Sequence, residues 1–380
     1  YQGAVVYVAD ASRAVGVAST LLSEDRRKAY IAELKEKYQQ LREQRAGQQQ
    51  DRKLASLDEA RSNKFQTDWN SYRPVKPAFL GIRVFDNYPL SELITHIDWS
   101  PFFKAWELSG KFPAILDDEV VGVEARRLFD DARSMLERIV NEHWLQARAV
   151  IGFFPANTIN DDDIELYSDE SRSEIETVFH FPRQQMSRRN QAPNHCLADF
   201  IAPKDSGTED YLGAFAVTAG IGIESRVAAF EAEHDDYNSI LLKALADRLA
   251  EAFAERMHER VRKEFWGYAP AENLSGEEMI KEEYRGIRPA PGYPACPDHT
   301  EKGTLWELLD PATNAGMTLT ESYAMLPTAS VSGLYFSHPE ARYFGIGKLG
   351  PDQVSDYAKR KGMTIEEVER WLAPVLGYNT

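Results

Sequence analysis

The segment of residues 288–302, RPAPGYPACPDHTEK, restricts the fold more than any other, because four prolines stand within its first ten positions. Proline fixes φ near about −65° and removes a backbone donor, so these residues cannot form an interior helix or a central strand. Each residue before a proline is also pushed toward an extended conformation. The sequence therefore predicts a stiff, irregular loop that carries side chains able to bind a ligand.

The composition of the chain narrows the classes of partner that it can bind. The 380 residues are 43% hydrophobic, which is enough for a sizeable core and for more than one folding unit. The longest apolar run, residues 213–223, is shorter than the ~18 residues of a membrane-spanning helix. The net charge of −16 disfavours nucleic acid and anionic membranes, which bind clustered Lys and Arg. Two cysteines make no disulfide framework, so we expect a cytoplasmic protein.

The hydrophobic spacing predicts both helices and strands, without a regular alternation of the two. Across residues 235–268, apolar side chains recur every four positions from Tyr237 to Met257, which is typical of a long helix packed on a core. A second helix is predicted at 116–140, with Val120 and Val123 on its apolar stripe, and a third from residue 364 to about 372. Strands are predicted at 149–157, 164–167, 212–220 and 329–336. This order favours an α+β fold, a mixed domain in which long helices pack on a central, largely antiparallel sheet.

The N-terminal part differs in composition from the rest of the chain. From Ser23 onward, apolar residues spaced by three and four among many charges predict a long, solvated amphipathic helix. Residues 46–53, AGQQQDRK, are of low complexity and predict a flexible joint. Residues 57–79 contain YRPVKP and predict an extended arm. We therefore expect the main boundary near residues 46–60.

Metal binding and nucleophilic catalysis both find weak support in the sequence. Cys296 and His299 have a ligand spacing, and His195 and Cys196 offer two more donors, but structural zinc sites usually show two spaced pairs. Buried thiols and hydrogen-bonded histidines are the simpler interpretation. The sequence also lacks a G-x-S-x-G elbow and a complete phosphate-binding loop. We predict no catalytic residue and no metal ligand in this chain.

A binding role for the proline-rich segment follows from the chemistry of its side chains. A backbone that is rigid in advance loses less entropy when a ligand binds. Arg288 offers a planar fork for a carboxylate, Gly292 permits close approach to the backbone, and Tyr293 offers a stacking face. On these residues alone, a strap that merely covers a core is an equally good interpretation.

The same segment resembles the S-adenosylmethionine-binding motif of the activation domain at the C-terminus of cobalamin-dependent methionine synthase. Further stretches resemble that family in the same order along the chain, from about residue 60 to the end: IDWSPFF (97–103), GFFPAN (152–157), CLADFIAPK (196–204), ASVSGLYFSHP (329–339) and RKGMTIEEVERWLAP (360–374). The resemblance implies three parts: residues 1–20 as the tail of a cobalamin-binding domain, 21–59 as a helical and flexible interdomain linker, and 60–380 as the activation domain.

The resemblance also implies a function. In this family a methyltransferase moves a methyl group from 5-methyltetrahydrofolate to homocysteine through cobalamin, and the activation domain supports reductive methylation of cob(II)alamin to methylcobalamin by S-adenosylmethionine. Its implied partners are the cobalamin-binding domain of the same chain and flavodoxin or a flavoprotein reductase. Cobalamin lies mainly in a domain that this sequence lacks, and zinc only in the missing homocysteine domain. We expect this fragment alone not to make methionine. The alternative is a non-catalytic module that clamps a partner domain.

The resemblance assigns five residues to direct contact with S-adenosylmethionine. It implies that Arg288 engages the methionine carboxylate, and a bidentate fork is suited to that task. Asp98 would accept hydrogen bonds from the ligand amine. Ala290, Gly292 and Tyr293 belong to the same motif.

Further residues are implied around this site. Tyr343 and Phe344 match an aromatic pair that contacts the ligand, and the alternative is an edge-strand pair in the core. Glu251 and Glu282 match acidic positions whose charge would suit a sulfonium, and the alternative is two surface carboxylates. His299 is implied to face the corrin.

Overall fold

The computed structural model describes residues 6, 11–50, 54–187 and 192–379. The chain divides into two units, Tyr1–Ala55 and Ser56–Thr380. The first unit contains α1 (Ala11–Leu22) and α2 (Glu24–Gln50). The helix expected from residue 23 is confirmed, and it includes residues 46–50, which we expected in a flexible joint. Alanine and glutamine favour a helix enough to offset the single Gly47. Residues 51–53 of that joint lie outside the described residues.

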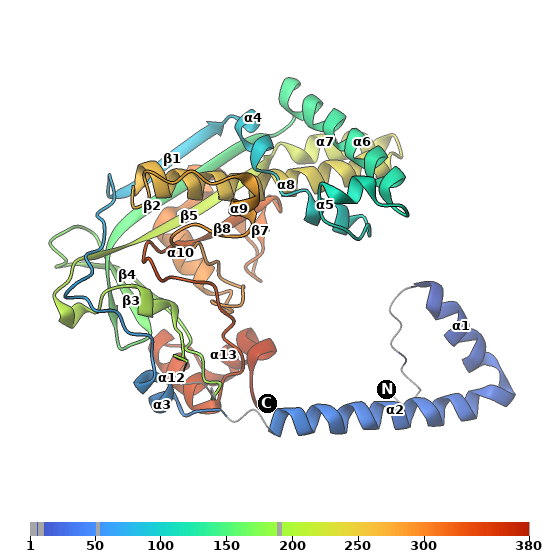
Figure 1. Cartoon of the computed structure of the whole chain (residues 1–380), viewed down its shortest axis with the longest axis horizontal. Helices are drawn as coiled ribbons and strands as arrows, with labels where there is room; N and C mark the ends of the chain where they lie inside the picture. Colours follow the sequence, from blue (N-terminus) through green and yellow to red (C-terminus); the bar gives the residue numbers. More distant parts are fainter. Residues whose placement is uncertain (1–5, 7–10, 51–53, 188–191, 380) are drawn as a thin grey trace. The chain divides into compact units, whose positions relative to one another are not determined.

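The centre of the second unit is an antiparallel sheet (Figure 1). In the described part of the chain, six strands form it in the order β4-β3-β2-β5-β8, with β1 also paired to β2. Their bounds are β1 Gly81–Tyr88, β2 Gln146–Ile159, β3 Asp163–Tyr167, β4 Ile175–His180, β5 Asp210–Ile221 and β8 Ser330–Tyr335. The long strand β2 pairs along one edge with β5, and along the other first with β1 and then with β3. The α+β prediction is confirmed.

Helices cover both faces of this sheet. Alternate residues of β2 point to opposite faces, so that Ile151 and Phe153 join one buried cluster while Val150 and Phe154 join another. The first cluster includes α6 (Gly122–Asn141) and α8 (Asp236–Arg260), and the second includes α10 (Glu301–Leu309) and α11 (Pro311–Ala315). The remaining helices are α3 Leu57–Ser62, α4 Leu90–Leu93, α5 Ser100–Ala105, α7 Ile223–Ala232, α9 Gly276–Ile280, α12 Pro351–Lys361 and α13 Ile365–Leu372, and β6 Thr318–Leu319 pairs with β7 Met325–Leu326.

The helix predicted at 235–268 is confirmed for most of its length. The apolar residues spaced by four on α8 are buried, from Leu241 to Met257. The α-helix ends at Arg260, however, and Val261–Phe265 form a turn of π-helix. This wider turn carries Arg262 into the interior, where its side chain has no exposure and its Nε donates to both oxygens of Glu272 at 2.9 and 3.0 Å.

Two other predictions required correction. The helix expected at 116–140 begins at Gly122, because Asp118 Oδ1 accepts from the N–H groups of Val120 and Val121 at 2.8 and 3.0 Å and holds a turn. Val120 precedes the helix and is 89% exposed, and Val123 lies on the outer face of its first turn and is 78% exposed. The arm expected at 57–79 starts instead with helix α3, because Ser56 and Glu59 form a capping box.

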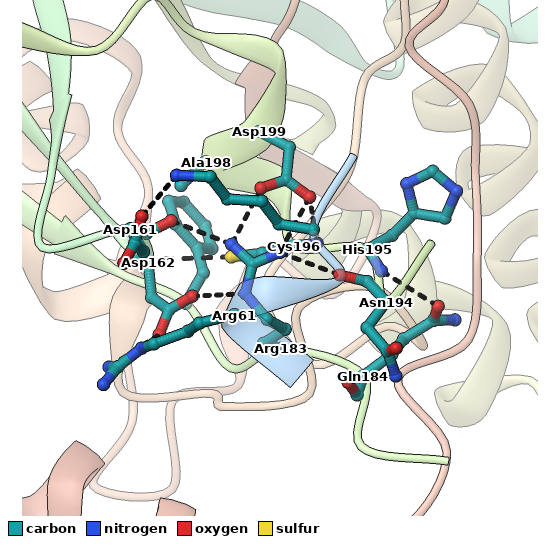
Figure 2. A network of polar contacts seen from close by, with 12 residues as sticks. Arg61, Asp161, Asp162, Arg183, Gln184, Asn194, His195, Cys196, Ala198 and Asp199 are labelled. Carbon is teal, nitrogen blue, oxygen red and sulfur yellow. Dashed lines mark hydrogen bonds and ion pairs between the residues drawn. The ribbon is translucent and has the colours of Figure 1, made fainter. Parts of the chain in front are cut away.

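A buried ionic network joins α3 to the sheet (Figure 2). The Arg183 side chain is fully buried, and its Nε and Nη2 lie 2.7 Å from carboxylate oxygens of Asp162 and Asp199. Arg61 of α3 donates to the other oxygen of Asp162 at 2.8 Å. Since each buried charge has an opposite partner, the network ties distant segments together without an unpaired ion. No helix in the described part of the chain is long and apolar enough to cross a membrane.

Candidate ligand-binding site

The proline-rich segment is held against strand β8. Ile287 and Phe336 form an antiparallel bridge, and Leu334 N donates to Pro289 O at 2.9 Å. On its other side, Ile346 N donates to Pro294 O at 2.8 Å. A proline has no N–H to donate, so Pro289 and Pro294 contact the neighbouring segments through their carbonyl oxygens, which accept N–H groups. The prediction of a stiff, irregular loop is confirmed.

A cleft of about 480 Å³ lies beside this loop. Helix α8, the segment before α10, strand β8 and the segment after β8 all contribute to its wall. The lining residues are Glu251, Glu282, Arg288, Pro289, Ala290, Tyr293, Pro294, Ala295, Val331, Tyr343, Phe344 and Gly345. Its volume is in the range of small-molecule sites. Seven of the sequence-predicted residues therefore share one cavity, although they come from segments far apart in the chain.

Arg288 is anchored by four neighbours at the inner end of the cleft. Its Nη2 lies 2.8 Å from Glu255 Oε2, and its Nη1 donates to Tyr284 Oη at 2.8 Å and to His258 Nδ1 at 3.3 Å. Its backbone N–H donates to Tyr343 Oη at 3.0 Å. Because arginine only donates, His258 Nδ1 must accept, which places the proton of the neutral ring on Nε2. Burial opposes the charge of Arg288, but Glu255 raises the pKa of the guanidinium above its ordinary value.

Two carboxyl groups face the same space. Burial raises the pKa of Glu251, with Arg248 and Arg288 acting in the opposite direction. Burial also raises the pKa of Glu282, again opposed by Arg288. Two carboxyl groups line the cavity together, so it offers negative charge to a cationic ligand. Both residues line the cavity, but Glu282 is exposed and Glu251 is only partly buried, so their contact with a ligand stays a prediction beside the alternative of two surface carboxylates.

The aromatic residues Tyr343 and Phe344 lie in a segment without strand structure. Both line the cleft, and the alternative of an edge-strand pair is therefore wrong. Tyr343 is 37% exposed and Tyr293 is 60% exposed, which is unusual for such large side chains. They offer ring faces to a ligand that enters from solvent.

Gly292 and His299 are not among the residues that line the cleft. Gly292 has φ +94°, and a Cβ placed there would lie 2.6 Å from His299 Nδ1. The close approach that we predicted at this glycine is therefore made by a neighbouring imidazole. Lys302 Nζ donates to His299 Nδ1 at 2.9 Å, and burial, reinforced by Lys302, lowers the pKa of the His299 ring. The proton of the neutral ring is consequently on Nε2.

Asp98 also lies outside the lining of the cleft. Its Oδ1 accepts from Ser100 N at 2.9 Å at the start of α5. This contact gives Asp98 a local structural role, and its contact with a ligand amine stays a prediction.

The residues weighed for metal binding are occupied in other ways. Cys196 and Cys296 are buried, and burial raises the pKa of each thiol. His195 packs near the rings of Phe200 and Phe344, with centroids 6.1 and 5.5 Å away. Within the ranges that the structure describes, no group of three or more His, Cys, Asp or Glu side chains is arranged to hold a metal ion.

Sequence reasoning missed the residues that hold Arg288. Tyr284 stands four positions before Arg288, and Glu255 stands four positions after Glu251 on α8. The second spacing places both glutamates on one face of the helix, which was a usable signal once Glu251 had been singled out. His258 gave no comparable signal, because a histidine on a helix is ordinarily part of the packing.

Comparisons with known proteins agree with this geometry. The family model for the activation domain of vitamin B12 dependent methionine synthase matches residues 89–362. A solved crystal structure of the MetH reactivation domain bound to AdoHcy is also similar, with 57% sequence identity and a TM-score of 0.83. That match covers 86% of this chain and 99% of the other. The resemblance based on residues 288–302 is confirmed, and the chain belongs to the family of methionine synthase activation domains.

Proposed function

We propose that the cleft beside residues 288–295 binds S-adenosylmethionine, and that this domain presents the ligand's methyl group for the reactivation of methionine synthase. The observation that carries the proposal is the placement of Arg288 at the inner end of a cavity that also contains Glu251 and Glu282. The similar MetH reactivation domain was solved with AdoHcy bound, which supports the same class of ligand here.

The charges of the ligand complement those of the cleft. S-adenosylmethionine carries one carboxylate, one ammonium and one sulfonium, and its net charge is therefore positive. Arg288 matches the carboxylate, and the two glutamates match the cationic groups. Tyr293, Tyr343 and Phe344 provide faces for the adenine and ribose. Asp98 and the backbone around Ala290 and Gly292 are proposed as further contacts from the family resemblance.

The chemistry requires little acid or base assistance from the protein. A sulfonium methyl is already activated, so these residues must bind the donor, align it and keep its methyl group accessible. The proline-rich loop, which is held between β8 and Ile346, meets this need, because its prolines restrict the backbone before the ligand arrives. Cobalamin, held by its own domain, would supply the cobalt nucleophile, and the electron for its reduction would come from the flavodoxin or flavoprotein reductase. His299 is proposed to face the corrin through its Nε2–H.

The wider activity follows from the family and is proposed on the same basis. The full-length enzyme would transfer a methyl group from 5-methyltetrahydrofolate to homocysteine, with zinc confined to the homocysteine domain. The cobalamin-binding domain and a flavodoxin or flavoprotein reductase would be the partners, in the cytoplasm. Residues 1–20, 21–59 and 60–380 would be the domain tail, the linker and the activation domain.

Isothermal titration of the 380-residue chain with S-adenosylmethionine tests the proposal. We expect saturable binding by the wild type and a loss of about tenfold or more in Arg288→Ala, because a charged hydrogen-bonding partner is removed. Arg127→Ala is a suitable control, because Arg127 pairs with Glu124 on the exposed face of α6 and does not line the cleft. No binding at millimolar ligand would reject the proposal and favour a module that only clamps a partner.

A further inference from the structure

Arg288 is the member that lines the cleft in a row of alternating charges. The row runs from Arg288 through Glu255 and Arg262 to Glu272, and Arg262 is its least exposed member. Arg262 Nη2 lies 2.8 Å from Glu272 Oε1, and Arg262 Nη1 lies 3.8 Å from Glu255 Oε1. Glu255 Oε2 lies 2.8 Å from Arg288 Nη2. All four side chains are less than 20% exposed, and the two positive and two negative charges balance.

We propose that Glu255 is a positioning residue, which holds the Arg288 guanidinium in the orientation that receives the carboxylate of the ligand. The inference deepens the proposed function and rests on it. Glu255 does not line the cleft, so its effect on a ligand would pass through Arg288.

The donors of Arg288 show how this orientation exposes a fork. A guanidinium has five N–H groups. The described hydrogen bonds of this side chain use both hydrogens of Nη1, for Tyr284 and His258, and Nη2 forms an ion pair with Glu255. In the described part of the chain no hydrogen bond uses the Nε–H, and on a guanidinium this group lies beside an Nη2–H that points in the same direction. Such a pair of donors matches the two oxygens of a carboxylate.

Glu255 differs from the other two side-chain anchors in the nitrogen that it contacts. Tyr284 and His258 both accept from Nη1, whereas Glu255 is paired with Nη2, so it fixes the second terminal nitrogen of the guanidinium. Glu255 projects from the same helix as Glu251, and its second oxygen lies 3.8 Å from Arg262 Nη1 as an ion pair without a hydrogen bond. The π-helical turn at Val261–Phe265 brings Arg262 to that position. A local departure from α-helix therefore supports the binding site.

A purely electrostatic role for Glu255 predicts different behaviour from a positioning role. Glu255→Gln keeps an acceptor oxygen at the same reach and removes the charge. Glu255→Asp keeps the charge and withdraws it by one methylene. Positioning requires that the glutamine variant bind the ligand better than the aspartate variant, whereas charge balance alone requires the reverse order.

The experiment is titration calorimetry of the full chain with S-adenosylmethionine and with its decarboxylated form, which lacks only the carboxylate. We expect Glu255→Asp to bind S-adenosylmethionine about tenfold or more weakly than the wild type, and Glu255→Gln to lose about threefold or less. With the decarboxylated ligand, the two variants should differ by less than threefold. In an Arg288→Ala background, Glu255→Asp should cause no additional loss, since the group that it positions is absent.

The results separate this inference from the function on which it depends. Equal losses in the aspartate and glutamine variants would overturn it, as would losses that multiply with that of Arg288→Ala. In either case the wild type would still bind and Arg288→Ala would still be weak, so the proposed function would stand. No binding by the wild type would overturn both. Thermal unfolding of each variant identifies a loss of folding, and the comparison of the two ligands does not depend on it.

Discussion

The substitution Gly292→Ala tests whether a glycine in the proline-rich loop is required by the fold of the loop itself. Gly292 has φ +94°, which an L-residue rarely adopts, and its N–H donates to Cys296 O at 2.7 Å. An added Cβ would lie 2.6 Å from His299 Nδ1 and 2.9 Å from Nε2. Alanine therefore meets two separate penalties, one from the backbone and one from the imidazole.

The chain contains a matched control for the backbone penalty. Gly362 ends α12 with φ +66°, and a Cβ placed there has no heavy atom within 4 Å. Gly362→Ala should reduce the free energy of unfolding by about 1–2 kcal/mol, which is the cost of a left-handed conformation. At Gly292, displacement of the His299 ring adds about 1–3 kcal/mol, as overpacking does in other tightly packed sites. We expect a total of roughly 2–5 kcal/mol there.

Urea unfolding of both variants, followed by tryptophan fluorescence, measures this difference. The double variant Gly292→Ala/His299→Ala should recover the steric part, because the ring that obstructs Cβ is absent. A Gly292→Ala variant no less stable than Gly362→Ala would refute the reasoning. So would a double variant whose losses simply add. Either outcome would return Gly292 to the role suggested by the family motif, in which the ligand itself approaches the backbone.

Three further predictions concern other parts of the molecule. Glu282 has φ +57° just after α9, where glycine is preferred, so Glu282→Gly should raise the free energy of unfolding by about 1 kcal/mol while weakening S-adenosylmethionine binding in calorimetry. Burial lowers the pKa of His338 to about 4, below its ordinary 6.5. The unfolded chain therefore binds this proton first, and the free energy of unfolding should fall by up to about 3 kcal/mol between pH 6.5 and 4, a slope that urea titrations of His338→Gln should lack. Arg183→Met leaves the buried Asp199 without its cation and Asp162 with Arg61 alone, and should cost about 3–5 kcal/mol in urea unfolding.

The extent to which the sequence predicted the fold depended on the range of the interactions involved. Helix α8 was predictable because its apolar residues repeat every four positions, and that repeat follows from helical geometry alone. The π-helical turn after Arg260 was not predictable, because it depends on a contact between Arg262 and Glu272, and the intervening residues give no periodic signal. Val120 was misplaced for a similar reason, since a side-chain bond from Asp118 fixes where α6 begins.

The candidate site shows the same division. Residues that line the cleft were found through a family motif, and the structure brings Arg288, Tyr293 and Tyr343 together around one cavity. Gly292 was assigned by the same reasoning, but a glycine has the same sequence signature whether a ligand or a neighbouring ring approaches it. Only the position of His299 distinguishes the two. A motif thus identifies residues that belong to one loop without separating those that face the ligand from those that shape the backbone.

Glu255 helps to separate residues that face the ligand from residues that shape the site, because it contacts Arg288 without lining the cleft. A carboxylate that paired with Arg288 from inside the cleft would compete with the ligand for it, because both are anions. Glu255 instead occupies Nη2 from the side of α8, and the contacts of Tyr284 and His258 occupy Nη1. These contacts hold the guanidinium in one orientation, in which the Nε–H and the neighbouring Nη2–H remain for the carboxylate of the ligand. If ligand binding is governed in this way, substitutions behind the cleft will alter affinity for the carboxylate specifically, whereas substitutions of the aromatic residues will alter affinity for every adenosyl ligand alike.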